Sequence, residues 1–284
     1  GWACSKLAEG TVFPNFTLQL LVGIILHDAL APIAPQIMIP VVVCTALAAI
    51  ILKGGGDEVE RLDFLKIAYP VLMIAVVGYL ITFFIMFPLL LLLGLDGRTA
   101  ALLAAIIGST DPAALIPTLK KVAFKDQYKR LSGLSVAESA VNDAVGAIFV
   151  GALATMILAG TSVETTAALT SGLFSADNMM SLGRQFLFGT IAGVIGWGFM
   201  YSYEKYKSTH HHNTGEAETA YDFAIVLAVP LVTFVLAQGL HGNGFLAAFI
   251  AGLLANYNHN NHAFQKTLHT MEIKIESISK PMVF

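Results

Sequence analysis

The stretch LSGLSVAESAVNDAVGAIFVGALATMILAGTSV, residues 131–163, contains no Lys or Arg, and its charged side chains are those of Glu138 and Asp143. It is longer than the about 20 residues that a helix needs to cross a bilayer. A second run without Lys or Arg, residues 99–119, carries one further acid, Asp111. Charge at membrane depth is unfavourable by several kcal/mol unless it is paired, hydrated or neutralised, so these acids are the first candidates for function.

Composition also points to a membrane protein. The chain has 284 residues, of which 56% are hydrophobic and 12% charged, which is about half the charged fraction of a typical soluble domain. A net charge of -3 without a basic arm excludes the electrostatic footprint of nucleic-acid binding. Cys4 and Cys44 form neither a disulfide framework nor a metal-ligand pattern. These properties exclude a soluble enzyme and predict an all-α polytopic membrane protein.

Runs long enough to cross the hydrocarbon predict about eight spans in a single transmembrane transport domain, residues 1–284. Behind them, residues 262–280 carry apolar side chains at helical spacing among charged ones, which predicts an amphipathic linking helix. Pro281 to Phe284 look like the opening of another span. We therefore expect an N-terminal fragment whose C-terminal helices are missing. The expected spans are 13–30, 36–52, 67–95, 99–119, 131–159, 185–203, 223–240 and 244–256.

The distribution of Lys and Arg in short loops predicts the orientation. If the loop of residues 53–66 is cytoplasmic, alternation of the spans places the basic loop 120–130 on the same side, and only Arg98 and Arg184 fall outside. We therefore predict a multi-pass protein of the plasma membrane whose two acidic runs are joined by a cytoplasmic loop.

Depth decides whether the acids can form one site. At 1.5 Å per residue, Asp143 lies about 16 Å from a helix start near Ser132, and Asp111 about 12 Å from a helix end near Leu119. Both estimates start at the cytoplasmic surface of a core about 30 Å thick. The two carboxylates can therefore lie at similar depth if their helices are neighbours.

The residues around these acids predict a cation site. Proline disfavours helix at the residue before it and removes a backbone donor, so the segment 110–112 is expected to interrupt its helix. Unwound carbonyls at mid-membrane recur as Na+ ligands in transporters. On the other helix, two pairs of oxygen-bearing side chains lie four residues apart and share a stripe, and oxygen donors suit a hard cation. The candidate ligands are Thr110, Asp111, Glu138, Ser139, Asn142 and Asp143.

Other interpretations of single residues stay open at this point. Ser135 and Glu138 fit a capping box, so Glu138 could close a helix start. Asp111 could be a turn residue before proline. The triplet His210 to His212 suggests metal binding or pH sensing, although its loop is polar throughout and a solvated loop is the simpler reading. Small residues at four-residue spacing predict close helix packing; they are Gly189 and Gly193, and Gly244, Ala248 and Gly252.

Two strings carry a family resemblance: Ser109-Thr110-Asp111-Pro112-Ala113-Ala114, and Glu138-Ser139-Ala140-Val141-Asn142-Asp143-Ala144-Val145. In motif, order and spacing they resemble the monovalent cation/proton antiporters, and the Asn-Asp pair resembles the electroneutral sodium/proton exchanger branch. The segment 244–252 and Gly54-Gly55 are similar to the same family, so the resemblance covers nearly the whole chain.

The resemblance implies a role for each candidate. The residue matching Asp143 binds the ion and carries the proton, and Asp111 and Asn142 organise the site. Further ligands match Glu138, Ser139 and, through its main chain, Thr110. The family fold is a helical bundle of inverted repeats that forms homodimers, and its second half supplies another interrupted helix and a basic residue near the acids. Neither of those two elements is visible before Phe284.

The predicted function is transport and not enzyme catalysis, without a cofactor. If a proton and Na+ or Li+ compete for Asp143, and access alternates only when that charge is neutralised, exchange is one for one; Asn142 in place of a second acid fits zero net charge per cycle. A K+/H+ antiporter is the alternative, because Na+ and K+ preference depends on cavity size and ligand number. A cation channel is less favoured, since it needs a continuous, ring-like filter.

Overall fold

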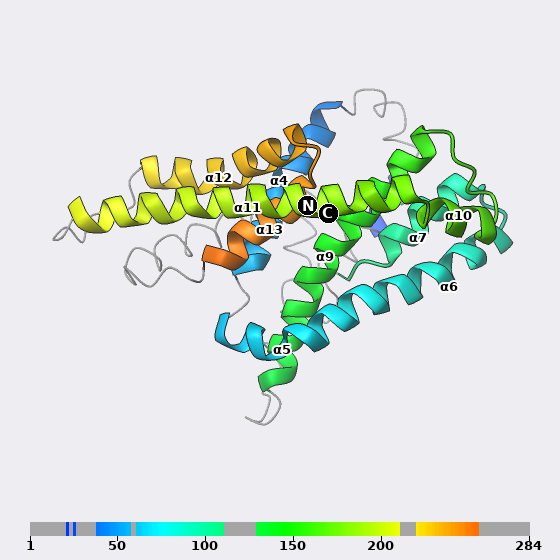
Figure 1. Cartoon of the computed structure of the whole chain (residues 1–284), viewed down its shortest axis with the longest axis horizontal. Helices are drawn as coiled ribbons and strands as arrows, with labels where there is room; N and C mark the ends of the chain where they lie inside the picture. The colour runs from blue at the N-terminus through cyan, green and yellow to red at the C-terminus, as the bar shows by residue number, and fades with distance from the viewer. Residues whose placement is uncertain are drawn as a thin grey trace.

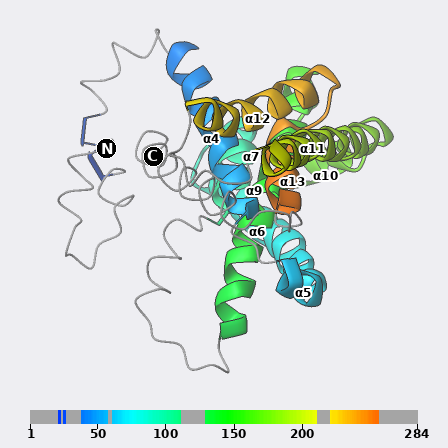
Figure 2. The same cartoon turned by 90° about the vertical axis from the view of Figure 1, so that its left-hand side faces the viewer.

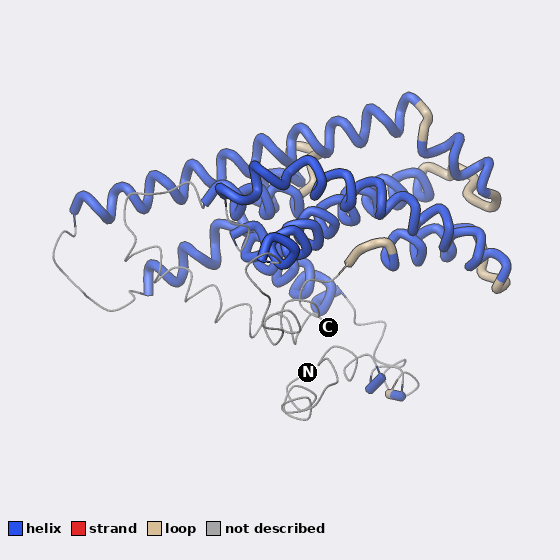
Figure 3. Tube along the Cα trace, turned by 90° about the horizontal axis from the view of Figure 1, so that it is seen from below, coloured by secondary structure: helices blue, strands red, loops and turns tan. Residues whose placement is uncertain are grey.

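The computed structural model describes residues 21–22, 25–26, 38–57, 61–110, 129–210 and 220–255. All regular structure within these ranges is helical (Figure 3). The helices are α4 (Met38–Asp57), α5 (Arg61–Met73), the π-helical turn η2 (Ile74–Gly78), α6 (Tyr79–Leu92), α7 (Gly97–Ile107), α9 (Lys129–Leu158), α10 (Thr166–Leu173), α11 (Ala176–His210), α12 (Ala220–Gly239) and α13 (Gly244–Ala255).

Four helical segments of the described chain are long and apolar enough to cross a membrane: Lys66–Leu92, Ala137–Leu158, Ala176–Tyr206 and Asp222–Gly239. α7 and α13 are apolar but shorter. The predicted all-α polytopic membrane protein is confirmed. The expected first span and the linking helix 262–280 fall almost wholly outside the described residues, so the count of eight spans stays a prediction.

The outer face of α6 shows how the fold meets lipid. Ile81, Ile85, Leu89 and Leu92 recur at helical spacing and are exposed, whereas the opposite face of the helix is buried. An exposed apolar stripe of this kind is unfavourable in water and suits acyl chains. α6 therefore separates a lipid-facing side from a protein-facing side along its whole length.

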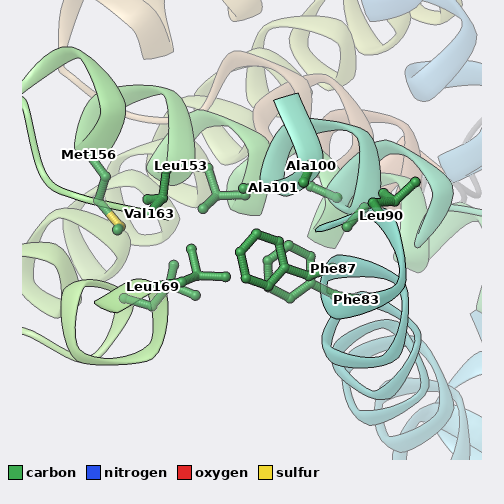
Figure 4. Packing of buried hydrophobic residues seen from close by; sticks show 12 residues of the cluster. Phe83, Phe87, Leu90, Ala100, Ala101, Leu153, Met156, Val163 and Leu169 are labelled. Atoms are coloured by element: carbon green, nitrogen blue, oxygen red, sulfur yellow. The ribbon is translucent and has the colours of Figure 1, made fainter. Parts of the chain in front are cut away.

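The protein-facing side of α6 forms a hydrophobic core with α7, α9 and α10. Phe83 and Phe87 are fully buried, with ring centroids 6.2 Å apart, and Phe83 meets Phe149 of α9 edge to face at 4.7 Å. Figure 4 shows the two rings of α6 in the middle of this cluster, with Leu169 of α10 beside them. The core fixes α7 against α9, the two helices that carry the candidate site.

α13 is the centre of the other half of the molecule. It packs against α4, α11, α12 and α9, and both views show it beside α4 and α11, with α12 running along α11 (Figures 1 and 2). Glycines allow this approach: a Cβ on Gly193 would lie 2.7 Å from the Ala247 carbonyl, and one on Gly252 would overlap the Lys53 carbonyl. The predicted close packing of small residues is confirmed.

Several boundaries differ from those expected. α4 continues to Asp57, so Lys53 is not a loop residue; its side chain is 3% exposed and lies 2.7 Å from Asp57. An ion pair one turn apart lets the helix carry charge past the expected end at residue 52. α11 is longer at both ends than expected and reaches His210, while residues 211–212 lie outside the described part. α10 was not expected, and Thr165 caps its start.

α9 also corrects one reading of Glu138. The helix begins at Lys129, so Glu138 lies well inside it and does not close its start. The Ser135–Glu138 pattern is therefore not a capping box, and the carboxylate is available for another role. Most of loop 120–130 lies outside the described residues, so the orientation stays a prediction.

Candidate ion-binding site

The chain leaves α7 beside the middle of α9. α7 ends at Ile107, Gly108 still donates to the Ala104 carbonyl, and Ser109 and Thr110 are no longer helical. The helix expected over 99–119 thus ends before Thr110, while Asp111 and Pro112 lie outside the described residues, so the predicted interruption over 110–112 stays a prediction. Backbone released from a helix at membrane depth has to find partners in the protein or in a wet cavity.

Tyr79 at the start of α6 supports this helix end. Its hydroxyl donates a 2.9 Å hydrogen bond to the Ala105 carbonyl, and its ring is buried. A Cβ on Gly108 would lie 2.9 Å from that ring, and one on Gly146 of α9 would lie 3.5 Å from it. Gly108 therefore lets the ring pack closely against the end of α7, and the same ring edge also lies beside α9 at Gly146.

Thr110 is tied to α9 by its backbone. Ser139 Oγ donates to the Thr110 carbonyl at 2.7 Å and accepts from the Thr110 hydroxyl at 3.4 Å. The Thr110 N–H donates to Asn142 Oδ1 at 3.2 Å. Ser139 is 1% exposed and Asn142 2% exposed. Two buried polar side chains of α9 thus satisfy the unwound donor and acceptor.

The two acids of α9 face this segment with different partners. Asp143 Oδ1 accepts a 2.8 Å hydrogen bond from Ser109 Oγ. Glu138 Oε1 accepts a 3.2 Å hydrogen bond from Asn142 Nδ2. Both acids are half-buried. Carboxylate, hydroxyl, amide and carbonyl oxygens therefore gather within one turn of α9 and the end of α7.

Five of the six candidates predicted from the sequence come together in this way; Asp111 lies outside the described residues. They are Thr110, Glu138, Ser139, Asn142 and Asp143. The sequence reasoning missed Ser109 and Tyr79. Ser109 stood in the quoted motif as a hydroxyl one residue before the expected break, whereas nothing in the sequence near Tyr79 signalled its part.

A cluster of oxygen donors decides which ions the site suits. Within the described residues no group of three or more His, Cys, Asp or Glu side chains forms a metal site. Two carboxylates, three hydroxyls and a main-chain carbonyl are hard ligands that suit a proton or a hard cation better than a soft transition metal.

A cavity of about 640 Å³ adjoins the site on the side toward the Leu158 end of α9. It is lined by residues of α7, α9, α11 and the turn between α12 and α13. Ser109 and Gly146 border it next to Asp143, and the exposed side chains of Arg184 and His241 border it farther away. A space larger than several water molecules therefore reaches the residue that holds Asp143.

Comparison with known proteins agrees with this arrangement. The model of the family described as "Sodium/hydrogen exchanger, transmembrane" matches residues 2–284. A K(+)/H(+) antiporter, NhaP2 of Shewanella oneidensis, is 28% identical over 206 residues, which are 72% of this chain and 32% of that protein. The low-affinity Na(+)/H(+) antiporter NhaS1 of Synechocystis sp. is 26% identical over 192 residues, 66% of this chain and 32% of that protein. The chain spans about a third of the length of these relatives.

Proposed function

Because the chain belongs to the transmembrane sodium/hydrogen exchanger family, we propose that it exchanges a monovalent cation for a proton across a membrane. The family consists of cation/proton antiporters, which are transporters and not enzymes. Helices with exposed apolar faces place the chain in the bilayer as a multi-pass protein.

One observation carries the proposal: the unwound end of α7 lies against the acidic turn of α9. The Thr110 carbonyl accepts from Ser139, and Ser109 donates to Asp143. Carbonyl and carboxylate oxygens at mid-membrane are a recurring coordination set for alkali cations in transporters. Ionisable side chains are rare in membrane spans, and those present are usually paired or functional.

Asp143 is the residue for which proton and cation compete in this proposal. Glu138, Ser139 and the Thr110 carbonyl supply further oxygens, and Asn142 and Asp111 organise the site. If access changes only when the Asp143 charge is neutralised, either ion is carried and the empty charged site is not. One cation then moves for each proton, and the transport is electroneutral.

Na+ or Li+ is the first candidate cation, and K+ is the second. The relatives support both, since one carries K+ in its name and the other Na+. We also propose a homodimer in the plasma membrane with loop 120–130 in the cytoplasm, which rests on the basic residues of that loop and on the family resemblance.

The test is proton efflux from vesicles reconstituted with the full-length protein, measured with an internal pH dye while Na+, Li+ or K+ is added outside. The Asp143→Asn variant should lose exchange with all three cations but still insert. Asp177→Asn, the same chemical change at an exposed acid of α11, serves as the matched control and should exchange normally. Cation-dependent flux that persists in Asp143→Asn removes Asp143 from the mechanism.

The same vesicles test the coupling. If one proton leaves for each cation, an imposed membrane voltage should leave the exchange rate unchanged. A rate that follows the voltage would exclude electroneutral exchange and would favour either another stoichiometry or a channel.

A further inference from the structure

The cavity next to the site is bordered by one residue of the site, among those that the structure describes. Among the described residues of the site, Ser109 is the one that lines the cavity. Thr110, Glu138, Ser139, Asn142 and Asp143 do not border the cavity. Since Ser109 Oγ is hydrogen-bonded to Asp143, an ion that reaches Asp143 from this side passes close to the Ser109 hydroxyl.

Ser109 lies directly beside Gly146 of α9. A Cβ at Gly146 would lie 3.4 Å from both Cβ and Oγ of Ser109, which is van der Waals contact. Ser109 therefore lies against α9, with its Oγ 2.8 Å from Asp143 Oδ1. Gly146 also lines the cavity, so next to Asp143 the cavity wall includes one small hydroxyl and one residue without a side chain.

A serine hydroxyl can change its role without moving far. It has one hydrogen to donate and two lone pairs that accept. In the structure its hydrogen points to the Asp143 carboxylate. A cation at that carboxylate repels the hydrogen and attracts the lone pairs, so rotation about the Cβ–Oγ bond turns the donor into a ligand.

We propose that Ser109 closes the cavity side of the site, and that a cation entering from the cavity replaces its hydrogen bond to Asp143 and then binds its oxygen. This inference rests on the proposed function, because it assigns the route and the first ligand for the same ion. It goes beyond the six predicted residues, since Ser109 lay outside that set.

Thiol accessibility tests the route. Ser109→Cys is placed in a full-length background without other cysteines, reconstituted, and treated on one side at a time with a small cationic methanethiosulfonate. The thiol should react from one side of the membrane, and saturating Na+ should slow the reaction at least tenfold. Thr155→Cys, on an exposed position of the same cavity, is the matched control and should react at a rate that Na+ does not change.

Kinetics test the ligand role. Ser109→Ala should raise the apparent KM for the cation about tenfold, the effect expected for losing a polar contact to a charged group, with the maximal rate retained. Ser109→Thr keeps the hydroxyl and should restore the KM. The inference is overturned if the KM of Ser109→Ala lies within twofold of the KM of the parent protein. It is also overturned if Na+ does not change the reaction rate of Ser109→Cys.

A combined variant separates this inference from the proposed function. In Ser109→Cys with Asp143→Asn, protection by Na+ should disappear, because the ion has lost its anchor. If Asp143→Asn abolishes exchange while Na+ never protects Ser109→Cys, the role of Ser109 is wrong and the exchange site at Asp143 stands. If Asp143→Asn still exchanges cations, the proposed function itself is wrong.

Discussion

Asn142 donates a 3.2 Å hydrogen bond to the carboxylate of Glu138, one turn earlier on α9. The same side chain accepts the N–H of Thr110 at 3.2 Å. A primary amide can donate and accept at once, and a carboxylate only accepts. The neutral member of the Asn-Asp pair therefore joins an acid of α9 to the unwound backbone after α7, which an aspartate could not do.

Asn142→Asp tests this double role. The variant keeps an acceptor for Thr110 but loses the donor to Glu138 and adds a like charge beside it. We expect a loss of about 1–3 kcal/mol in the free energy of unfolding, seen as a lower Tm of the purified protein in detergent. Asn178→Asp is the control, because Asn178 is half-buried and donates to the Gly172 carbonyl far from the site. It should lower Tm while leaving the apparent cation affinity unchanged; an unaltered Tm in Asn142→Asp would contradict the bridge.

Ser139→Ala removes a buried donor from the Thr110 carbonyl. The loss should lower the free energy of unfolding by about 1 kcal/mol and weaken cation binding, because the carbonyl is no longer held in place. Ser202→Ala provides the comparison: Ser202 also donates to a helix carbonyl at 2.7 Å, but it is exposed. Its effect should stay within about 0.5 kcal/mol. Equal effects of the two variants on thermal unfolding and cation affinity would show that Ser139 has no special part.

Gly252→Ala tests the contact between α13 and α4. A Cβ at this position would overlap the Lys53 carbonyl, and backbone cannot give way as a side chain can. We expect destabilisation of at least about 1–3 kcal/mol. Gly183→Ala is the matched change on α11, where nothing lies within 4 Å of the added Cβ. It should be neutral or stabilising by up to about 1 kcal/mol. Thermal unfolding of both variants decides the point.

Asp96, which lies outside the membrane spans, should make the stability of the protein depend on pH. It caps α7 by accepting the Thr99 N–H at 3.1 Å, and this backbone hydrogen bond, with one from the Thr99 side chain, lowers the pKa of Asp96 from its ordinary value. A lowered pKa in the folded state means that the cap stabilises the protein above the unfolded pKa and that this contribution is lost as pH falls through the folded value. Asp96→Ala should therefore reduce Tm at pH 7, and the difference from the parent protein should shrink below pH 4.

Thr165→Ala is the control for that experiment. Thr165 caps α10 through a hydroxyl, which accepts the Ala168 N–H at 3.2 Å and carries no charge. The loss of this cap should be independent of pH. A pH-dependent difference in Thr165→Ala, or a constant one in Asp96→Ala, would show that the carboxylate charge is not the cause.

The sequence predicted the parts of the fold that depend on hydropathy alone. α9 was expected over 131–159 and runs Lys129–Leu158. The agreement is close because a run without Lys or Arg ends where the helix leaves the apolar part of the membrane. The sequence placed the acids of both runs at similar depth but left open whether their helices are neighbours; the structure shows that α7 and α9 are in contact. The helix matching α4 was predicted to end at residue 52, five residues too early. A prediction from uncharged runs ends the helix at the first charged residue, and it does not detect that Lys53 is buried and paired with Asp57.

The rest required three-dimensional contacts. Tyr79 lies thirty residues before the break that it supports, and no local pattern announces such a partner. The π-helical turn at Ile74–Gly78, directly before Tyr79, likewise has no pattern in the sequence that predicts it. Ser109 stood inside the recognised motif, yet its contact with Asp143 follows from the approach of the end of α7 to α9, which no local pattern shows.

The Tyr79 ring has a mechanical consequence. Its hydroxyl donates to the Ala105 carbonyl of α7, and its ring lies against Gly108 and near Gly146 of α9. Since packed interiors transmit displacement and do not absorb it, a shift of the start of α6 is passed on to the end of α7 and to the acidic turn of α9. A disturbance of Tyr79 therefore reaches the candidate site, although Tyr79 is not one of its candidate ligands.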